Sequence, residues 1–442
     1  MRLTCIHTIF LAFGILMGYI ITLIDWQFEY PGWTATHNIT GSLITFKRNN
    51  DMIITAYGKN SAEDALKALG WAHIHDRYVQ ICLYRLISQG KLSETLPPNE
   101  KSFQLDFRSK QLNLWENAIQ SYNSISNENM KQIGAYIDGI NFYIKSHPRP
   151  IEFILINYYP TSFTVIDILI IQKFIAFAGL NDINLLVEKV LLEVIRETDQ
   201  HSLLKDTFYP HLNDLNEDLV EIYKSLKDFR PLADHSTSDI PKITNSNNWV
   251  ISGKLSKSGF PIMGSDPHMD IAKMPNIFYE SQYIADDGLR FFGVSPVGVP
   301  VMLFGKTQNI SFSLTFGMLD MADYFIENIK DKQYERDGKF YPLEERTVNI
   351  QDKTIFFYET SEGHQIERRL ESYEDPISTG KYLAARYPMT AEVDSANSKL
   401  FGVAMETNIF KCMEVVSFNG LGTNFIFADN QGNIAYQQVT II

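Results

Sequence analysis

The residues with the clearest chemical potential lie between Asn245 and His268. Two apolar runs, Trp249–Ile251 and Phe260–Met263, flank a polar turn, which is the pattern of a β-hairpin. Ser246 stands at the entry of this hairpin and carries a hydroxyl group that could act as a nucleophile. If the chain is cut before Ser246, a free α-amine with a pKa of about 7.7–8.0 lies beside that hydroxyl. Nucleophile and general base then belong to one residue, an arrangement suited to amide hydrolysis.

Two short motifs in this stretch resemble the penicillin acylase family of N-terminal nucleophile hydrolases. The family's second chain begins with Ser-Asn-x-Trp and carries Asp-Pro-His further on. The matching residues here are Ser246–Trp249 and Asp266–His268. A lone Ser-Asn-x-Trp is more often a turn before a strand. The two motifs stand in the family's order, however, and more matches lie on both sides of them.

Three other segments extend the resemblance over residues 40–440. Gly70–Glu94 matches the first-chain signature, which reads Gly-aromatic-x-His-x-x-Asp-Arg and then Gly-Lys/Arg-Leu-Ser-Glu. Asp76 and Arg77 could be catalytic by residue type, but the resemblance implies a structural role for both. Tyr136–Tyr143 and Asn424–Tyr436 match two further family segments.

The resemblance implies a catalytic site with three parts. Ser246 with its α-amine supplies the nucleophile and base, and His268 supports the amine side. A backbone N–H near Phe316 is one donor to the oxyanion. For His268, a purely structural, hydrogen-bonded role is an equally open interpretation. The residues Gly305-Lys306-Thr307 and Phe312-Ser313 depart from the family's Gly-His-Asn and Trp-Gly, which places differences at the pocket wall.

The resemblance also implies a structural calcium ion. Asp320-Met321-Ala322-Asp323 corresponds to the family's calcium loop, with carboxylate ligands from Asp320 and Asp323 and a carbonyl ligand from Ala322. Glu188 is the expected ligand from the first chain. Oxygen ligands of this kind suit calcium. By composition alone, two such aspartates are also typical of a solvated turn.

A helical first part and a strand-rich second part predict the α+β class, and the resemblance implies the N-terminal nucleophile hydrolase αββα four-layer sandwich. Residues 27–199 form an α-chain-like helical region and residues 246–442 a partial β-chain-like region. Between them, 200–245 is acidic and contains prolines, and is interpreted as a spacer or propeptide, with a surface insertion as the alternative. Helices are predicted over 61–70, 79–90, 133–144, 164–180, 181–192 and 408–417, and strands over 43–45, 52–55, 277–283, 289–294, 301–304, 310–316, 324–329 and 355–358.

Charge and the first residues bear on partners and location. A formal net charge of −13 argues against a nucleic-acid partner. Residues 5–24 are almost wholly apolar and long enough to span a bilayer, so residues 1–26 are a cleaved signal peptide or a signal-anchor. Either one predicts a secreted or membrane-anchored protein with its main domain outside the cytosol. Cys82 lies on an apolar helical face and is expected to be a buried free thiol, and nothing supports a disulfide with Cys412.

Two functions remain open at this point. The first is an autoprocessed N-terminal serine amidohydrolase, an α/β heterodimer once cut, that cleaves the amide bond of N-acylated small molecules. Penicillin-type amides and acyl-homoserine lactones are both compatible substrates. The alternative is a truncated or degenerate, inactive relative, because the family's second chain continues beyond the position of Ile442 and carries a second oxyanion donor there. The C-terminal portion of the fold is therefore expected to be missing.

Overall fold

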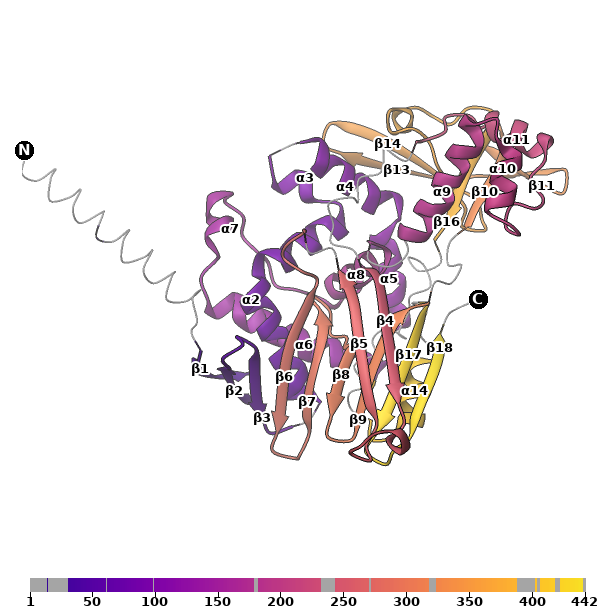
Figure 1. The fold of residues 1–442 in the computed structure, drawn as a ribbon. Helices are drawn as coiled ribbons and strands as arrows, with labels where there is room; N and C mark the ends of the chain where they lie inside the picture. Colours follow the sequence, from indigo (N-terminus) through magenta and orange to yellow (C-terminus); the bar gives the residue numbers. More distant parts are fainter. Residues whose placement is uncertain are drawn as a thin grey trace, which may run out of the picture.

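The computed structural model describes residues 14, 31–60, 62–97, 99–178, 182–231, 243–269, 272–317, 323–387, 402–403, 406–417 and 422–439. Helices dominate before residue 231 and strands dominate after residue 243, so the predicted α+β class is confirmed (Figure 1).

A nine-stranded sheet lies at the centre of the fold and combines both parts of the sequence. The strand β3 pairs in parallel with β6, and this pair joins the three N-terminal strands to those of the second part. All other neighbours in this sheet are antiparallel. In order across the sheet the strands are β1 (Thr34–Ile39), β2 (Ser42–Arg48), β3 (Ile54–Gly58), β6 (Phe278–Ala285), β7 (Arg290–Pro296), β8 (Phe304–Thr307), β9 (Ile310–Phe316), β17 (Thr423–Asp429) and β18 (Ile434–Val439).

Helices cover one face of this sheet. The long helix α2 (Glu63–Gln89) packs on β2, β3 and β6, and its fully buried Trp71 stacks on Phe46 of β2. Helix α6 (Asn127–Ser146) lies tightly against α2, and α8 (Val165–Ala176) packs on both. The remaining helices of the first part are α3 (Leu92–Thr95), α4 (Glu100–Gln111), α5 (Leu114–Ser124) and α7 (Ile151–Leu155).

The opposite face of the sheet carries the hairpin of β4 (Ile243–Ile251) and β5 (Ile262–Met269). Ser265 of the hairpin is hydrogen-bonded to Ser313 of β9, with 2.7 Å between the two Oγ atoms. Because side chains alternate along a strand, Phe312 and Leu314 point to the other face, into the helical core. Helices, central sheet and hairpin are thus successive layers, as the predicted sandwich requires.

A second, seven-stranded sheet is inserted in sequence between β9 and β17 of the central sheet and lies above it in Figure 1. Helix α4 packs against it through Phe103 and Phe107, which share a core with Phe357 and Tyr373. Its strands, in order across the sheet, are β12 (Lys339–Pro342), β11 (Gln333–Arg336), β10 (Asp323–Lys330), β16 (Gly380–Arg386), β15 (Gln365–Ile366), β14 (Lys353–Glu359) and β13 (Glu344–Ile350). The 3-10 helix η5 (Leu370–Glu374) packs on β14, and α14 (Ile409–Val416) packs on β17 and β18 of the central sheet.

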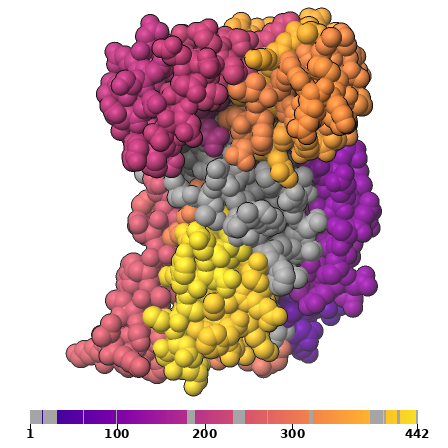
Figure 2. Space-filling view, turned by 90° about the vertical axis from the view of Figure 1, so that its right-hand side faces the viewer, coloured from indigo at the N-terminus to yellow at the C-terminus, as the bar shows by residue number. Residues whose placement is uncertain are grey.

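The segment interpreted as a spacer contains ordered helices up to residue 231. Helix α9 (Asp182–Glu197) is followed by α10 (His201–Thr207) and α11 (Glu217–Lys224), and the three lie beside the seven-stranded sheet (Figures 1 and 2). Leu226 and Phe229, just after α11, are buried against Leu383 of β16. The backbone N–H of Lys227 donates to the carbonyl of Lys381 (2.7 Å). Residues 226–229 are therefore packed against the seven-stranded sheet.

Several boundaries differ from the sequence-based expectation. The two helices predicted over 61–70 and 79–90 are one helix with a kink at Arg77 (φ −133°, ψ 31°). The strand predicted over 301–304 begins only at Phe304. Strand β4 begins at Ile243, so the expected cut before Ser246 falls inside a strand. Cys82 and Cys412 are both buried free thiols, and burial raises the pKa of Cys82 to about 12.

No helix in the described part of the chain is both long and apolar enough to cross a membrane. Residues 5–24, except Gly14, lie outside the described residues.

Candidate active site

The structure brings Ser246 and Phe316 together. Ser246 is half-buried on β4, opposite Pro267 of β5 in the antiparallel register. The backbone N–H of Phe316, the last residue of β9, donates a hydrogen bond to Ser246 Oγ (3.2 Å). The predicted nucleophile therefore lies within hydrogen-bonding distance of the predicted oxyanion donor, although the two residues are 70 positions apart in sequence.

Asn424 holds the end of β9 that carries this donor. Thr423 of β17 pairs with Phe316 in the sheet, and the side chain of Asn424 donates to the Phe316 carbonyl and to Thr315 Oγ1, each at 3.3 Å. The hydroxyl of Tyr436 on β18 donates to Asn424 Oδ1 (2.8 Å). The sequence motif at Asn424–Tyr436 marks this hairpin, but its positioning of Phe316 depends on strand pairing and was not predicted.

His268 lies near the Asn245–Ser246 peptide bond but on the other face of the hairpin from Ser246 Oγ. It pairs in register with Asn245, so its side chain projects with those of Asn245 and Asn247. His268 Nε2 is 3.0 Å from Asp266 Oδ2 and 3.4 Å from Asn247 Nδ2, and the imidazole is 41% exposed. The imidazole therefore lies beside Asn245, the residue that precedes the cut, and on the opposite face from Ser246 Oγ.

Two of the four expected calcium ligands lie within the described residues. Glu188 is half-buried on α9, which packs on β10, and Asp323 is exposed at the first position of β10. Burial is the main cause that holds the pKa of Tyr324, the residue after Asp323, well above its usual value, and the charge of Glu188 is a minor one. The calcium site stays a prediction. Asp320 and Ala322 lie outside the described residues.

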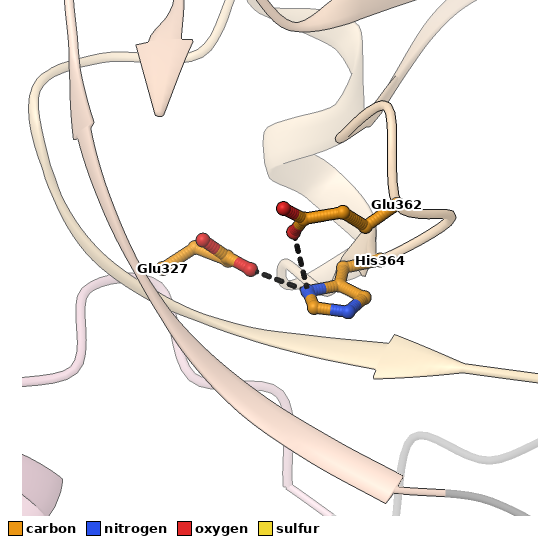
Figure 3. A group of neighbouring side chains, drawn as sticks. All are labelled: Glu327, Glu362 and His364. Carbon is orange, nitrogen blue, oxygen red and sulfur yellow. Dashed lines mark hydrogen bonds and ion pairs between the residues drawn. The ribbon is translucent and has the colours of Figure 1, made fainter. Parts of the chain in front are cut away.

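A different group of acidic and imidazole side chains lies in the seven-stranded sheet (Figure 3). Glu327, Glu362 and His364 converge, with His364 Nδ1 at 2.6 Å from Glu327 Oε1. Arg336 donates to both carboxylate oxygens of Glu327 (2.6 and 2.7 Å) and to Glu362. Burial acts to raise the pKa of Glu327, but the hydrogen bonds from Arg336 and His364 outweigh it and lower that pKa. A guanidinium group already neutralises these carboxylates, so the cluster is an ion-pair network rather than a metal site.

The polar side chains of the signature around Gly70–Arg77 range from fully buried to half-buried. Arg48 of β2 donates to both carboxylate oxygens of Asp76, and the Tyr279 hydroxyl donates to the same carboxylate (2.6 Å). His73 is fully buried between Tyr136 of α6 (2.7 Å) and Ser295 of β7 (2.8 Å). These contacts join α2 to the central sheet and to α6. They lie on the helical side of the sheet, whereas Ser246 belongs to the hairpin on the opposite side.

The buried His73 makes stability dependent on pH. Desolvation lowers the pKa of His73 from 6.5 to about 3, so the folded chain keeps a neutral imidazole where the unfolded chain takes up a proton. Stability is therefore lost as pH falls from 6.5 towards 3, by up to about 1.4 kcal/mol per pH unit. Measured by denaturant unfolding at pH 6.5 and 5.5, the His73→Asn variant is expected to show a smaller loss than the parent. Equal losses in the two proteins would contradict this assignment.

Comparison with known proteins identifies the family. The Penicillin amidase family matches residues 44–442, and the chain belongs to this family. It is 25% identical over 419 residues to an acyl-homoserine lactone acylase QuiP of Pseudomonas fluorescens (strain Pf0-1), which covers 88% of this chain and 49% of that protein. It is 23% identical over 400 residues to the penicillin acylase 2 proenzyme of Pseudomonas sp. (strain SE83), covering 84% and 49%.

Among solved structures, a thermostable penicillin G acylase from Alcaligenes faecalis aligns with a TM-score of 0.36 and 16% identity, over 44% of this chain and 35% of that one. The chain spans about half the length of the relatives that it matches.

Proposed function

We propose that this chain belongs to an N-terminal serine amidohydrolase that cleaves the amide bond of N-acylated small molecules. The observation that carries the proposal is the hydrogen bond from the Phe316 N–H to Ser246 Oγ, in a chain of the Penicillin amidase family. A hydroxyl nucleophile and a fixed backbone donor are two of the groups that acyl transfer needs.

The third group, a base, arises when the chain is cut between Asn245 and Ser246. In the cut, Ser246 Oγ attacks the Asn245 carbonyl carbon, the C–N bond breaks, and water opens the resulting ester. The freed α-amine then removes the proton from Ser246 Oγ as it attacks the substrate amide. The Phe316 N–H donates to the oxygen that becomes negative, the amine product leaves with the proton, and water hydrolyses the acyl-serine ester.

The substrate class follows from the named relatives. One of them is an acyl-homoserine lactone acylase and another a penicillin acylase, and each name denotes the removal of an acyl group from an amide nitrogen. The test is incubation of the purified protein with penicillin G and with N-acyl-homoserine lactones of different chain length, followed by mass spectrometry of the released amine. Release of amine supports the proposal, and an uncut, inactive chain supports the inactive relative instead.

Calcium binding is part of this proposal. Glu188 and Asp323, with Asp320 and Ala322, are the proposed ligands, and the ion would tie the first chain to the second without entering the reaction. Millimolar calcium is expected to raise the midpoint temperature of thermal unfolding. At a calcium concentration of 100 times the dissociation constant, binding increases the free energy of unfolding by about 2.7 kcal/mol. The Glu188→Gln variant is expected to lose this increase, whereas Glu197→Gln, on the exposed end of the same helix, is expected to keep it. An equal increase in both variants would remove Glu188 from the site.

We also propose that the protein acts outside the cytosol, secreted or anchored by residues 5–24. The support is the length of that apolar run.

A further inference from the structure

A cavity of about 480 Å³ lies where residues 226–229 meet the seven-stranded sheet, in the upper part of the molecule in Figure 2. Hydrogen bonds hold the walls of this cavity in place. The backbone N–H of Arg369 donates to the Asp228 carbonyl (3.1 Å), and Ser372 Oγ donates to the Asp228 carboxylate (2.7 Å). Leu226 and Phe229 are buried beneath this contact. The cavity is therefore framed by segments that the core holds in place.

Four cationic side chains line this cavity: Arg196, Lys227, Arg368 and Arg369. All of their hydrogen bonds go to uncharged acceptors. Arg368 donates to the carbonyls of Asp375 (3.0 Å) and Phe356 (2.9 Å), and Arg369 Nε donates to the Phe229 carbonyl (3.3 Å). Arg196 donates to the Tyr223 carbonyl, and Lys227 Nζ donates to Ser378 Oγ (2.7 Å) and the Thr379 carbonyl (3.1 Å).

None of the four cations has a carboxylate oxygen within 4.0 Å in the described part of the chain. Arg368 is 2% exposed, and its Nε and that of Arg196 are buried without a hydrogen-bond acceptor. The guanidinium groups of Arg196 and Arg368 lie over the rings of Phe229 (4.3 Å) and Tyr373 (4.8 Å), but a buried donor without an acceptor still costs free energy. Such a cluster is unexpected in a protein with a net charge of −13, which has acidic residues in excess.

The cations also repel one another. Burial is the largest cause that lowers the pKa of Arg196, and the charge of Arg369 acts in the same direction, whereas the nearby carboxylates of Glu197 and Glu193 act to raise that pKa. Three carboxylates belong to the same lining: Asp228, Glu371 and Asp375. Asp228 is engaged by Ser372, while Glu371 and Asp375 are exposed at the rim. The carboxylates therefore leave the guanidinium groups without direct ion pairs.

We propose that this cavity is a binding site for a small, multiply charged oxyanion of the phosphate type. Guanidinium groups bind such anions with paired, charge-assisted hydrogen bonds. Arg369 and Lys227 are exposed and line this cavity, so both can present their charge to an anion there. The site is separate from Ser246 and does not depend on the proposed acylase activity.

The test is isothermal titration calorimetry of the full chain with inorganic phosphate and with pyrophosphate, at constant ionic strength. One saturable site is expected, with pyrophosphate binding more tightly. In the double variant Arg196→Gln/Arg369→Gln, affinity is expected to fall by about tenfold to a hundredfold. The control is Lys131→Gln/Lys145→Gln, which removes the same charge from exposed positions on α6 and is expected to bind as the parent does.

No saturable binding at millimolar concentrations would overturn the proposal, as would equal weakening in the variant and its control. If circular dichroism shows that the double arginine variant does not fold, Lys227→Gln takes its place. Lys227 is exposed and its replacement leaves the core intact, so a weaker binding constant in that variant supports the site and an unchanged one contradicts it.

Discussion

Replacing Ser246 by alanine is expected to leave the chain uncut and without amidase activity. The side chain is the only nucleophile in the proposed reaction, and it is also the group that breaks the Asn245–Ser246 bond. Loss of the nucleophile lowers kcat by on the order of a million-fold in comparable hydrolases. Intact-mass analysis of the purified protein is expected to show a fragment that begins at Ser246 in the parent and a single full-length species in Ser246→Ala.

Two further variants make this result specific. Ser265→Ala removes a hydroxyl from the partner strand of the same hairpin, where it contacts Ser313 rather than Phe316, and is expected to be cut as the parent is. Ser246→Cys keeps a nucleophile and is expected to restore part of the cleavage. A Ser246→Ala protein that is still cut at this bond would mean that another protease acts there and that Ser246 is not the nucleophile.

Gly139→Ala is expected to destabilise the protein by at least about 3 kcal/mol, because the new methyl group has no room. A Cβ at residue 139 would lie 2.1 Å from the Lys67 carbonyl oxygen and 2.7 Å from the Trp71 backbone nitrogen. Both obstacles belong to the backbone of α2, so the two helices must move apart and expose Trp71. The measurement is the free energy of unfolding in denaturant.

Gly134→Ala is the matched control on the same helix. Nothing lies within 4 Å of a Cβ at that position, and alanine loses less conformational entropy than glycine in a helix. This variant is expected to be as stable as the parent, or more stable by about 0.5–1 kcal/mol. A similar loss in both variants would contradict the close contact of α2 and α6 as the cause, because helix propensity by itself favours alanine at both positions.

The sequence alone determined the local elements and the family. Thr164 and Asp167 form a capping box at the start of α8, where the sequence predicts a helix, and the apolar runs around residue 257 form the predicted hairpin. These features depend on contacts between residues close together in the chain, so they can be recognised without the fold. At the start of α2, by contrast, Asp64 accepts from the backbone N–H groups of Lys59 and Asn60, and the helix begins at Glu63 without a side-chain cap.

The resemblance named Ser246 and Phe316, but only the tertiary structure decided how they meet. Their contact requires the hairpin to lie on β9, and the pairing of β17 with β9 then holds the donor in place through Asn424. The strand register also places the His268 side chain on the other face of the hairpin, because side chains alternate along a strand. A linear motif does not specify this register.

Segments joined by long-range pairing were the least predictable. The acidic composition of residues 200–231 is typical of a mobile spacer, yet Leu226 and Phe229 are buried because Leu383 and the edge of β16 lie beside them. The parallel pairing of β3 with β6 likewise joins residues more than 200 positions apart. Burial of this kind depends on which surfaces the whole fold brings together, so periodicity and composition within one segment cannot determine it.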